Sequence, residues 1–215
     1  MQHDLPSVTV SRLVSYLRVL ADMEAEGVTY VTSERLGGAS RVSAHQVRKD
    51  LLLTRVTSGT RGRGYTVAIL RRELSSTLGL TRSWRVAIVG MGRLGQALAD
   101  YPDFSGFNFS LICGFDKDAT KVGKTLGALP VYDMNELGGR AREQALDIAF
   151  LTVPVASAQT ATDLIVAAGI RGILNFVPTV LTVPEAVRVE PVDFLAGLKR
   201  LAFYLQPHAG VAVTG

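Results

Sequence analysis

Apolar residues in the first part of the chain recur every three or four positions, the spacing of one buried helix face. The first such run follows Pro6-Ser7 and stops at Gly27. Thr32-Ser33 then offers an N-cap for a short helix through Leu36. The pair Gly37-Gly38 is expected to end that helix, because glycine is the usual residue after a helix C-terminus.

A third helix is expected to open at Ser43 with a capping box. In this arrangement the Ser43 hydroxyl accepts the Gln46 amide N–H, and the Gln46 side chain reaches back to the N-cap. Val47 and Leu51 are four residues apart, so they pack inward together. The outward face then carries the polar residues His45, Arg48 and Lys49.

The segment 57–65 is too rich in glycine for a helix and predicts a hairpin, followed by a helix over 67–78 that closes at Gly79. Three helices and a hairpin are the order of a winged helix-turn-helix, whose third helix enters the DNA major groove. Arg61 and Arg63 on the hairpin suit phosphates or the minor groove. The alternative is a solvated basic face on an ordinary helical domain.

The pattern changes after a junction at 80–83. A β-rich run, 84–89, leads into Gly90-Met91-Gly92-Arg93-Leu94-Gly95, and a helical stretch continues to Tyr101. This is the strand, G-x-G-x-x-G and helix order of a dinucleotide-binding fold. The first glycine permits a tight turn, the second lets a pyrophosphate approach, and the third lets helix and strand pack closely. The helix N-terminus presents free N–H groups to the phosphates.

An acidic residue follows the next predicted strand, Phe109 to Phe115. This residue, Asp116, lies 21 positions beyond Gly95. A carboxylate there accepts both ribose hydroxyls of NAD and repels the extra phosphate of NADP. The neighbouring Lys117 weakens that preference.

Strands and helices then continue to alternate, which predicts an α/β fold with a doubly wound parallel sheet. The segments are 146–152 (strand), 155–168 (helix), 172–176 (strand) and 187–189 (a possible last strand). Ligands bind at the carboxyl ends of such strands, although ordinary turn chemistry is an equal alternative for the residues found there. Those residues are Thr152, Val153, Pro154 and 175–178.

The last predicted helix, Asp193 to Gln206, has a broad apolar stripe, and Asp193 is its expected N-cap. The helix either covers the sheet or forms a subunit interface, since sequence-specific DNA readers usually bind as two-fold dimers. The expected domains are 1–82, a winged helix; 83–192, a Rossmann domain that binds NAD(H); and 193–215, a dimerisation helix and tail.

Charge separates the same two parts. The chain of 215 residues has a net charge of +4, but residues 1–82 hold 12 Lys/Arg and 7 Asp/Glu, whereas residues 83–215 hold 11 and 12. The basic excess predicts a polyanion-binding part joined to a neutral one. The candidate DNA-contacting residues are Ser43, His45, Gln46, Arg48, Lys49, Arg61 and Arg63.

The sequence also argues against several other classes of protein. A single cysteine, Cys113, excludes a disulfide scaffold and a Cys-rich zinc site. The N-terminus does not resemble a signal peptide, and we find no apolar run long enough for a membrane span. We therefore expect a soluble cytoplasmic protein without a metal.

A dehydrogenase is the main alternative, because it shares the Rossmann fold. Residues 83–215 are about what the sheet and its helices need, so no substrate domain remains. The three histidines, His3, His45 and His208, all lie outside the stretch between the glycine loop and the last helix. Tyr101 and Tyr132 remain as possible bases, without a recognisable catalytic spacing. The sequence favours a nucleotide that serves as a signal and a chain that is not an enzyme.

Six motifs, in order along residues 7–205, resemble the bacterial redox-sensing repressor family Rex. The resemblance implies a homodimeric repressor that binds double-stranded operator DNA, senses the ratio of NADH to NAD⁺, and leaves DNA when NADH binds. It also implies that the terminal helix is exchanged between subunits. The motifs are 46–51, 59–65, 90–95, 151–154, 172–176 and 192–198.

The resemblance also assigns individual residues. Asp193 and Phe194 match positions near the nicotinamide, Tyr101 matches a position at the dimer centre, and Arg18 matches one that faces Asp193 across the dimer. The segment 52–58 departs from the family pattern and is one residue longer. That departure bears on the packing of the wing and on the DNA sequence that is read, and Arg55 adds a candidate phosphate contact.

Overall fold

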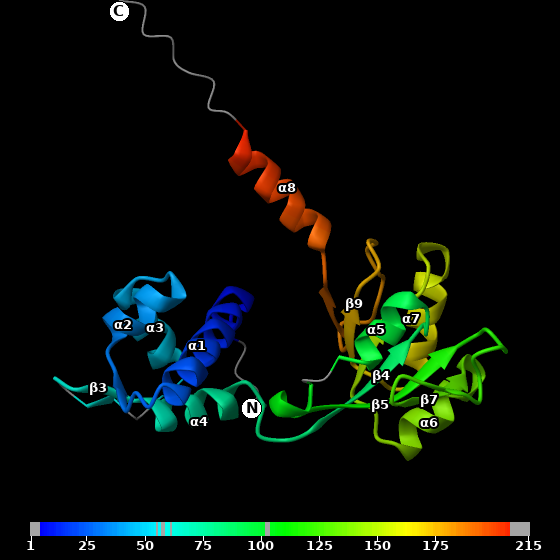
Figure 1. The fold of residues 1–215 in the computed structure, drawn as a ribbon, viewed down its shortest axis with the longest axis horizontal. Helices are drawn as coiled ribbons and strands as arrows, with labels where there is room; N and C mark the ends of the chain where they lie inside the picture. Colours follow the sequence, from blue (N-terminus) through cyan, green and yellow to red (C-terminus); the bar gives the residue numbers. More distant parts are fainter. Residues whose placement is uncertain (1–4, 55, 57–58, 61, 102–103, 207–215) are drawn as a thin grey trace, which may run out of the picture. The chain divides into compact units, whose positions relative to one another are not determined.

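The computed structural model describes residues 5–54, 56, 59–60, 62–101 and 104–206. The chain divides into two compact units, residues 1–82 and 83–215 (Figure 1). The junction falls between helix α4 (Val67–Thr77) and strand β4 (Trp84–Val89), where the charge balance of the sequence also changes. Each unit has its own buried apolar cluster, so each is described by itself.

The first unit has the order of a winged helix. A sheet in the order β1-β3-β2, antiparallel throughout, joins the helices. One apolar side from each of α1, α2, α3 and α4 packs into a common core that includes Leu13, Leu36, Val47 and Leu70. The elements are α1 (Ser7–Ala25), β1 (Tyr30–Val31), α2 (Ser33–Ser40), α3 (Ala44–Leu53), β2 (Gly59–Thr60), β3 (Gly64–Thr66) and α4 (Val67–Thr77).

Helix α2 does not end at Gly37-Gly38, and that expectation is wrong. The helix continues to Ser40, and Arg41 ends it with a left-handed backbone, φ 56°. Gly37 serves a different purpose, because a Cβ at this position would lie 2.5 Å from the Val42 carbonyl oxygen. The glycine therefore lets the turn before α3 approach α2 closely, and it is a packing residue instead of a stop signal.

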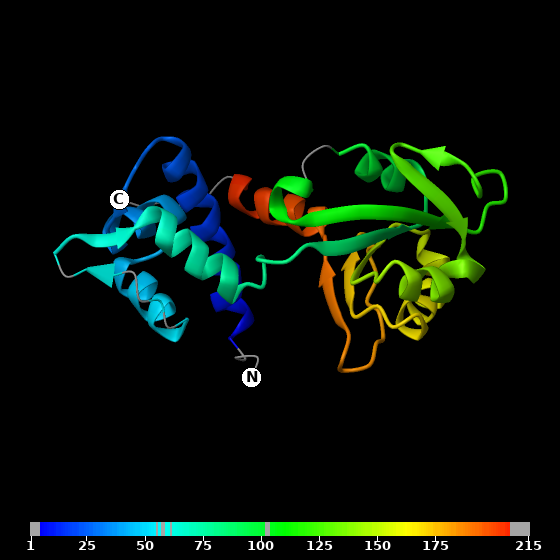
Figure 2. The ribbon, with the colours of Figure 1, turned by 90° about the horizontal axis from the view of Figure 1, so that it is seen from below.

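The second unit is a doubly wound α/β domain (Figures 1 and 2), as expected. Its sheet order is β10-β9-β8-β4-β5-β7-β6, parallel except for the antiparallel edge strand β6. The strands are β4 (Trp84–Val89), β5 (Phe109–Asp116), β6 (Thr125–Leu126), β7 (Leu129–Asp133), β8 (Ile148–Leu151), β9 (Gly172–Asn175) and β10 (Arg188–Pro191).

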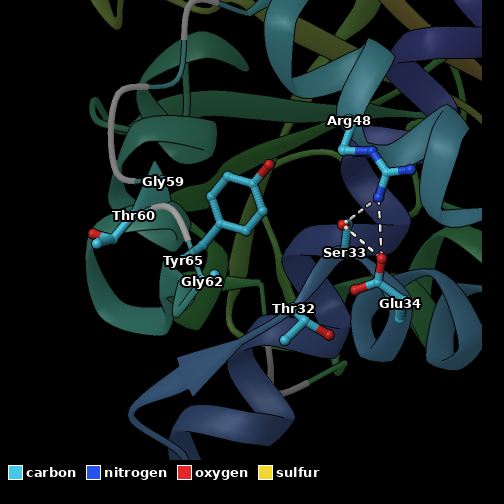
Figure 3. A pocket seen from close by; sticks show the side chains of 9 residues that line it. Thr32, Ser33, Glu34, Arg48, Gly59, Thr60, Gly62 and Tyr65 are labelled. Carbon is cyan, nitrogen blue, oxygen red and sulfur yellow. Dashed lines mark hydrogen bonds and ion pairs between the residues drawn. The ribbon is translucent and has the colours of Figure 1, made fainter.

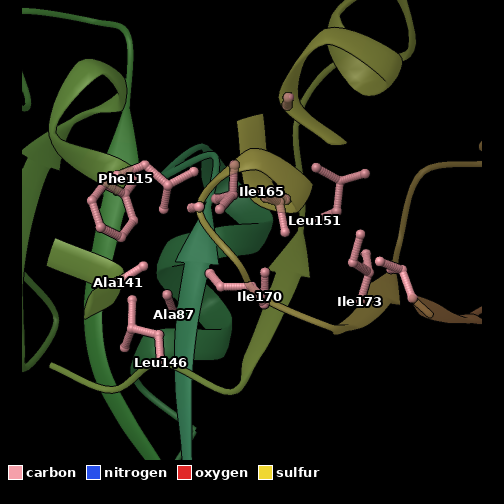
Figure 4. Packing of buried hydrophobic residues seen from close by; sticks show 14 of the residues in the cluster. Ala87, Phe115, Ala141, Leu146, Leu151, Ile165, Ile170 and Ile173 are labelled. Carbon is pink, nitrogen blue, oxygen red and sulfur yellow. The ribbon is translucent and has the colours of Figure 1, made fainter. Parts of the chain in front are cut away.

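Both faces of this sheet are covered. Ala87 and Val89 of β4 face a cluster that includes Ala141 and Ile165 of the covering helices (Figure 4), whereas Val86 on the other face packs in a cluster with Ala99 of α5. Burial on both faces explains the continuous apolar run in β4. The helices are α5 (Arg93–Ala99), η1 (Ser105–Phe107), η2 (Met134–Glu136), α6 (Leu137–Glu143), η3 (Val155–Ser157), α7 (Ala158–Ala167) and α8 (Phe194–Leu205).

The strand order reverses at β4. The chain moves from β4 to β5 and β7 on one side, and from β8 to β9 and β10 on the other. Open α/β sheets bind their ligands at the carboxyl edge of such a switch point. The loops after β4 and β8, Gly90–Gly95 and Thr152–Pro154, meet at this edge, as the sequence predicts.

Candidate nucleotide site and nucleic-acid interface

The three glycines after β4 have different surroundings. Gly90 has φ 101°, and a Cβ there would lie 2.8 Å from the Thr152 carbonyl carbon. A Cβ on Gly95 would collide with the Gly90 carbonyl oxygen, whereas a Cβ on Gly92 would meet nothing within 4 Å. Gly90 and Gly95 are therefore needed for packing within the protein. Gly92 borders open space, where a pyrophosphate could approach the backbone.

Side chains from three elements hold this loop in place. An Asp116 carboxylate oxygen accepts the Met91 N–H at 2.8 Å. The Thr152 hydroxyl donates to the Gly90 carbonyl oxygen at 2.7 Å, and the Gln96 side-chain amide donates to the Met91 carbonyl oxygen at 3.0 Å. The loop is thus fixed before any ligand binds, which lowers the ordering cost of binding.

Asp116 lies at the end of β5, beside the loop, where the ribose of a dinucleotide is expected. Its carboxylate also accepts the Asp118 N–H at 2.9 Å and pairs with Lys121 at 2.8 Å. Burial alone would raise the pKa of Asp116, but the hydrogen bonds from Lys121, Asp118 and Met91 outweigh it and lower that pKa. The group stays an anion, which is the form that accepts ribose hydroxyls.

Gln96 and Lys121 also support this site, although the sequence did not predict them. Gln96 lies on an early turn of α5 and Lys121 lies in an irregular segment, so neither belongs to a recognised motif. The spacing of five residues between Asp116 and Lys121 is a signal from which their ion pair could have been predicted. Thr152 was predicted as a candidate for cofactor contact, but its hydroxyl donates to backbone carbonyl oxygens of the protein. Turn chemistry is also what the structure shows for Asn175, whose side chain bonds to Val177 and Thr179.

The remaining predicted nucleotide residues lie on several elements of this unit. Met91 is buried, whereas Arg93 and Leu94 are exposed in the first turn of α5. Tyr101 is exposed, with its ring centroid 5.2 Å from that of Phe104. A cavity of about 470 Å³ lies between the segment after β9 and the start of α8. Its lining includes Asn175, Phe176, Asp193 and Phe194. Val153 is half-buried and Pro154 exposed.

Helix α8 starts as predicted, with the Asp193 carboxylate accepting the Ala196 N–H at 2.8 Å. No residue of α8 is buried. The structure therefore does not support the alternative that this helix covers the sheet. Arg18 is exposed on α1, and its pairing with Asp193 across a dimer stays a prediction.

Helix α3, the predicted recognition helix, presents the expected outer face. Val47 and Leu51 are buried, while His45, Arg48 and Lys49 are exposed. The Ser43 hydroxyl accepts the Gln46 N–H at 3.2 Å, which confirms half of the capping box. The other half is wrong, because the Gln46 side-chain amide donates to an Asp50 carboxylate oxygen at 2.8 Å. A hydrogen bond to a charged acceptor is stronger than the one that the Gln46 side-chain oxygen would accept from the Ser43 N–H.

Asp50 is the centre of a buried cluster that joins α3 to α1. Its carboxylate receives the Nε and NH2 groups of Arg12 at 2.6 and 2.7 Å and the Tyr16 hydroxyl at 2.8 Å. Burial would raise the pKa of Asp50, but hydrogen bonds from Arg12, Tyr16 and Gln46 lower it overall. Burial and the bond to Asp50 raise the pKa of Tyr16. The sequence analysis missed this cluster, since Arg12 is far away along the chain.

A groove of about 420 Å³ separates the start of α2 from the wing (Figure 3). Arg48 reaches into it from α3, and its NH1 donates to the Ser33 hydroxyl at 2.9 Å and to Glu34 at 3.1 Å. The opposite wall comes from the wing, including Thr60 and Tyr65. The predicted DNA-reading arginine therefore points to the space between the recognition helix and the wing.

The wing itself is the antiparallel pair β2 and β3. The Arg63 guanidinium lies 3.9 Å from the centroid of the Tyr30 ring, so its position is set by stacking on β1. Arg61, Arg55 and 57–58 lie outside the described residues, as do His3 and His208. Their expected roles stay predictions.

The described residues also bear on the predictions about the single cysteine, metal binding and membrane spans. Cys113 is buried in β5, and burial raises the pKa of its thiol to about 12, so it is protonated at neutral pH. Within the described part of the chain, no cluster of histidine, cysteine and acidic side chains suits a metal ion. In the same residues, every helix is too short or too polar to cross a bilayer.

These features define a class of protein, in which a winged-helix DNA-binding unit is joined to a dinucleotide-binding Rossmann unit. A family model described as "Putative DNA-binding protein N-terminus" matches residues 4–51, and one described as "CoA binding domain" matches residues 81–179. The chain belongs to the family of redox-sensing transcriptional repressors called Rex.

Relatives and solved structures cover nearly the whole chain. The repressor Rex of Thermus thermophilus is 53% identical over 93% of this chain and 93% of its own length, and that of Deinococcus radiodurans is 47% identical over 97% of each. The Rex-family repressor RSP in complex with β-NAD⁺ and operator DNA is 32% identical, with a TM-score of 0.88 over 94% of this chain and 92% of its own. RSP with β-NADH has 31% identity and a TM-score of 0.84 over 94% of each chain.

Proposed function

We propose that this protein is a transcriptional repressor that binds operator DNA and leaves it when NADH binds, so that the ratio of NADH to NAD⁺ sets repression. The observation that carries this proposal is a preformed glycine loop, open at Gly92, in the same chain as a basic recognition helix. The solved complexes of RSP, one with NAD⁺ and operator DNA and one with NADH, support it.

The nucleotide site fits a dinucleotide. Gly92 leaves room for a pyrophosphate, and Asp116 supplies an anionic acceptor for ribose hydroxyls. The same carboxylate disfavours the 2′-phosphate of NADP(H), but Lys121 partly neutralises it. We therefore assign NADH and NAD⁺ as the ligands, with some tolerance for the phosphorylated forms. When bound, the nicotinamide supplies a group whose charge differs between the two redox states.

The charge difference gives the protein a way to distinguish NADH from NAD⁺. Reduced nicotinamide is uncharged, so it can be buried beside an apolar side chain at lower cost than the NAD⁺ cation. Phe194, 69% exposed at the edge of the cavity after β9, is the aromatic surface available for that burial. A ligand shifts an equilibrium only by its differential affinity for the two states. Burial of NADH would favour the state in which the two DNA-binding units no longer match the operator half-sites.

The experiment is a titration of NADH and NAD⁺ against the protein bound to a labelled operator duplex selected from random DNA. We expect NADH to dissociate the complex at concentrations where NAD⁺ does not. Equal effects of the two nucleotides on the DNA affinity would refute the redox-sensing proposal.

The DNA-binding assignment has its own test. Arg48→Ala and Lys49→Ala should each abolish specific operator binding, because these side chains form the exposed basic face of α3. NADH binding should be unchanged in both variants. Lys124→Ala is the control, since Lys124 is an exposed lysine on the nucleotide-binding unit. Normal operator affinity of either α3 variant would show that another surface reads DNA.

We assign the nucleotide a signalling role and not a catalytic one, in line with relatives that are named as repressors. The Cys113 thiol is buried, and its raised pKa keeps it protonated at neutral pH. The Arg140 guanidinium stacks over the Tyr132 ring, 4.0 Å from the ring centroid. The alternative is an NAD-dependent oxidoreductase with a regulatory DNA-binding head. That alternative predicts turnover, which consumption of NADH with candidate small-molecule substrates would reveal.

We also assign the chain a homodimeric state, and a cytoplasmic location follows from operator DNA as its partner. Helix α8 is the basis for the dimer, because three leucines of its apolar stripe, Leu198, Leu201 and Leu205, are all exposed. A broad apolar stripe on a helix normally packs against a core or a partner. A second copy of the chain, with the helix exchanged, would bury it.

Oligomeric state by sedimentation tests this assignment. Leu198→Glu with Leu201→Glu should convert the dimer to a monomer, since two charges would be buried without partners. Leu164→Glu is the matched control, because Leu164 is an exposed leucine of α7. A dimer that survives the double substitution would exclude α8 as the interface.

A further inference from the structure

The ion pair between Arg48 and Glu34 has no evident role in stability. Its side chains are 51% and 68% exposed, respectively. Exposed pairs contribute little to folding, because water screens the attraction and two long side chains lose freedom. The pair is also unfavourable for general DNA affinity. A carboxylate at the edge of a groove beside the recognition helix repels phosphates, and phosphate contacts supply most of the non-specific affinity.

The geometry of Arg48 indicates what the pair does instead. Both of its hydrogen bonds come from NH1, to Ser33 and Glu34. No described residue accepts a hydrogen bond from its Nε or NH2. Arg12 shows how that other edge behaves when it has a partner, since its Nε and NH2 grip the two oxygens of Asp50 in parallel.

Two parallel donors match the O6 and N7 acceptors that guanine presents in the major groove. A guanidinium with NH1 fixed by the protein can use its Nε and NH2 edge for this contact. Because the side chain is already ordered, less rotamer freedom is lost when the contact forms.

Ser33 makes the support rigid. It is a buried residue in the first turn of α2, and its hydroxyl lies 3.5 Å from the Glu34 carboxylate oxygen that Arg48 also contacts. Figure 3 shows the three side chains converging, with the remaining nitrogens of Arg48 directed away from Glu34. The Glu34 backbone N–H and the Thr32 hydroxyl, followed by Arg48, lower the pKa of Glu34, so the carboxylate is charged at neutral pH.

We propose that Glu34, together with Ser33, is a positioning residue for DNA reading: it holds NH1 of Arg48 so that the Nε and NH2 edge reads one guanine in each operator half-site. This inference rests on the proposed DNA-binding function and adds a specificity determinant to it. Glu34 increases discrimination between sequences while it decreases affinity for DNA in general.

The test combines protein variants with a modified base. Operator duplexes selected from random DNA by the full-length protein are made with 7-deazaguanine, which lacks the N7 acceptor, at one guanine at a time. The wild-type protein should lose affinity about tenfold at one position per half-site, the size expected for half of a bidentate contact. Arg48→Ala, which should retain only non-specific DNA binding, should bind the modified and unmodified duplexes equally.

Glu34→Ala should lose most of this discrimination and bind random duplexes more tightly than the wild type does. Glu26→Ala is the matched control, because it removes one exposed acid from the same unit. The control should retain the full penalty at the modified guanine, which separates positioning from net charge. Unchanged NADH binding by each variant, with a wild-type circular dichroism spectrum, establishes that it is folded.

Two failures can be told apart. If the wild-type protein selects no sequence from random DNA, the proposed function is wrong, and this inference falls with it. If the wild type discriminates but Glu34→Ala discriminates equally well, only the role of Glu34 is wrong. Ser33→Ala gives an independent check, with a smaller loss of discrimination expected and the net charge unchanged.

Discussion

Gly92 and Gly95 separate two roles that a glycine motif combines. Gly92 faces open space, so the side chain that it lacks would otherwise occupy the path that we propose for the ligand. Gly95 lies against the Gly90 carbonyl oxygen, so its missing side chain serves the contact between α5 and the loop. The sequence predicts both roles from the spacing alone, and the structure shows that they can be tested separately.

Gly92→Ala should weaken NADH binding while leaving the free energy of unfolding nearly unchanged. The added methyl group meets no protein atom but occupies the path of the pyrophosphate. Gly95→Ala should lower the unfolding temperature of the nucleotide-binding unit, because backbone atoms must move. Fluorescence titration with NADH and calorimetry measure the two effects. Equal loss of stability in both variants would mean that the loop is packed differently.

At the scale of elements, the Asp50 cluster fixes the recognition helix. The carboxylate is fully buried, and its donors Arg12 and Tyr16 come from α1. Removal of one partner of a buried pair typically costs about 3 kcal/mol or more, because the other charge loses its compensation. The orientation of α3 on α1 therefore depends on one carboxylate.

Asp50→Asn should destabilise the winged-helix unit by about 3 kcal/mol at neutral pH. Amide hydrogen exchange over residues 44–53 measures the effect, with Asp22→Asn as the control, since Asp22 is an exposed acid on α1. If the two variants exchange alike, the cluster contributes no net stability.

The pH dependence has a definite sign. The pKa of Asp50 is lower in the folded protein than in the unfolded chain, so its contribution is present above the unfolded value of about 4 and is lost as the pH falls through the folded value. The stability difference between wild type and Asp50→Asn should therefore shrink in acid below about pH 4.

Local patterns predicted most elements but not all of them. The helices of the winged helix and the strands β4, β5, β8 and β9 follow from periodicity and caps. The strands β6 and β7 and helix α6 were not predicted, because β7 includes Pro130 and is short, and α6 contains Gly138-Gly139. Tertiary packing at the sheet edge overrides these weak local preferences.

At the scale of the molecule, the candidate sites were predictable where a motif fixes the backbone and not where distant side chains meet. The loop 90–95 and Asp116 belong to one motif and lie together. The contacts of Asp50 with Arg12, and of Arg48 with Glu34, join segments that are 38 and 14 residues apart, respectively. No spacing rule covers such pairs, so only the folded chain shows them.

The net charge of the whole chain indicates little until it is counted separately for the two units. The DNA-binding unit is basic and the nucleotide-binding unit is nearly neutral. DNA affinity should thus depend on salt through the first unit, whereas NADH affinity should depend on it much less. We propose that a change of state of the protein couples the two ligands.

That coupling must be reciprocal. If NADH lowers the affinity for the operator by a given factor, the operator must lower the affinity for NADH by the same factor. We expect NADH to bind the protein–operator complex more weakly than the free protein, with NAD⁺ showing a smaller factor or none. NADH fluorescence titrations with and without operator give one factor, and operator titrations with and without NADH give the other.

A duplex of the same length with a scrambled sequence is the control, because it should weaken NADH binding less than the operator does. Agreement between the two factors would establish that the NADH molecule measured by fluorescence is the one that releases the operator. If NADH released the operator while the NADH affinity measured by fluorescence stayed the same on the operator, the release would not come from that nucleotide site. The release would then require a different explanation, such as NADH bound at the DNA-binding surface itself.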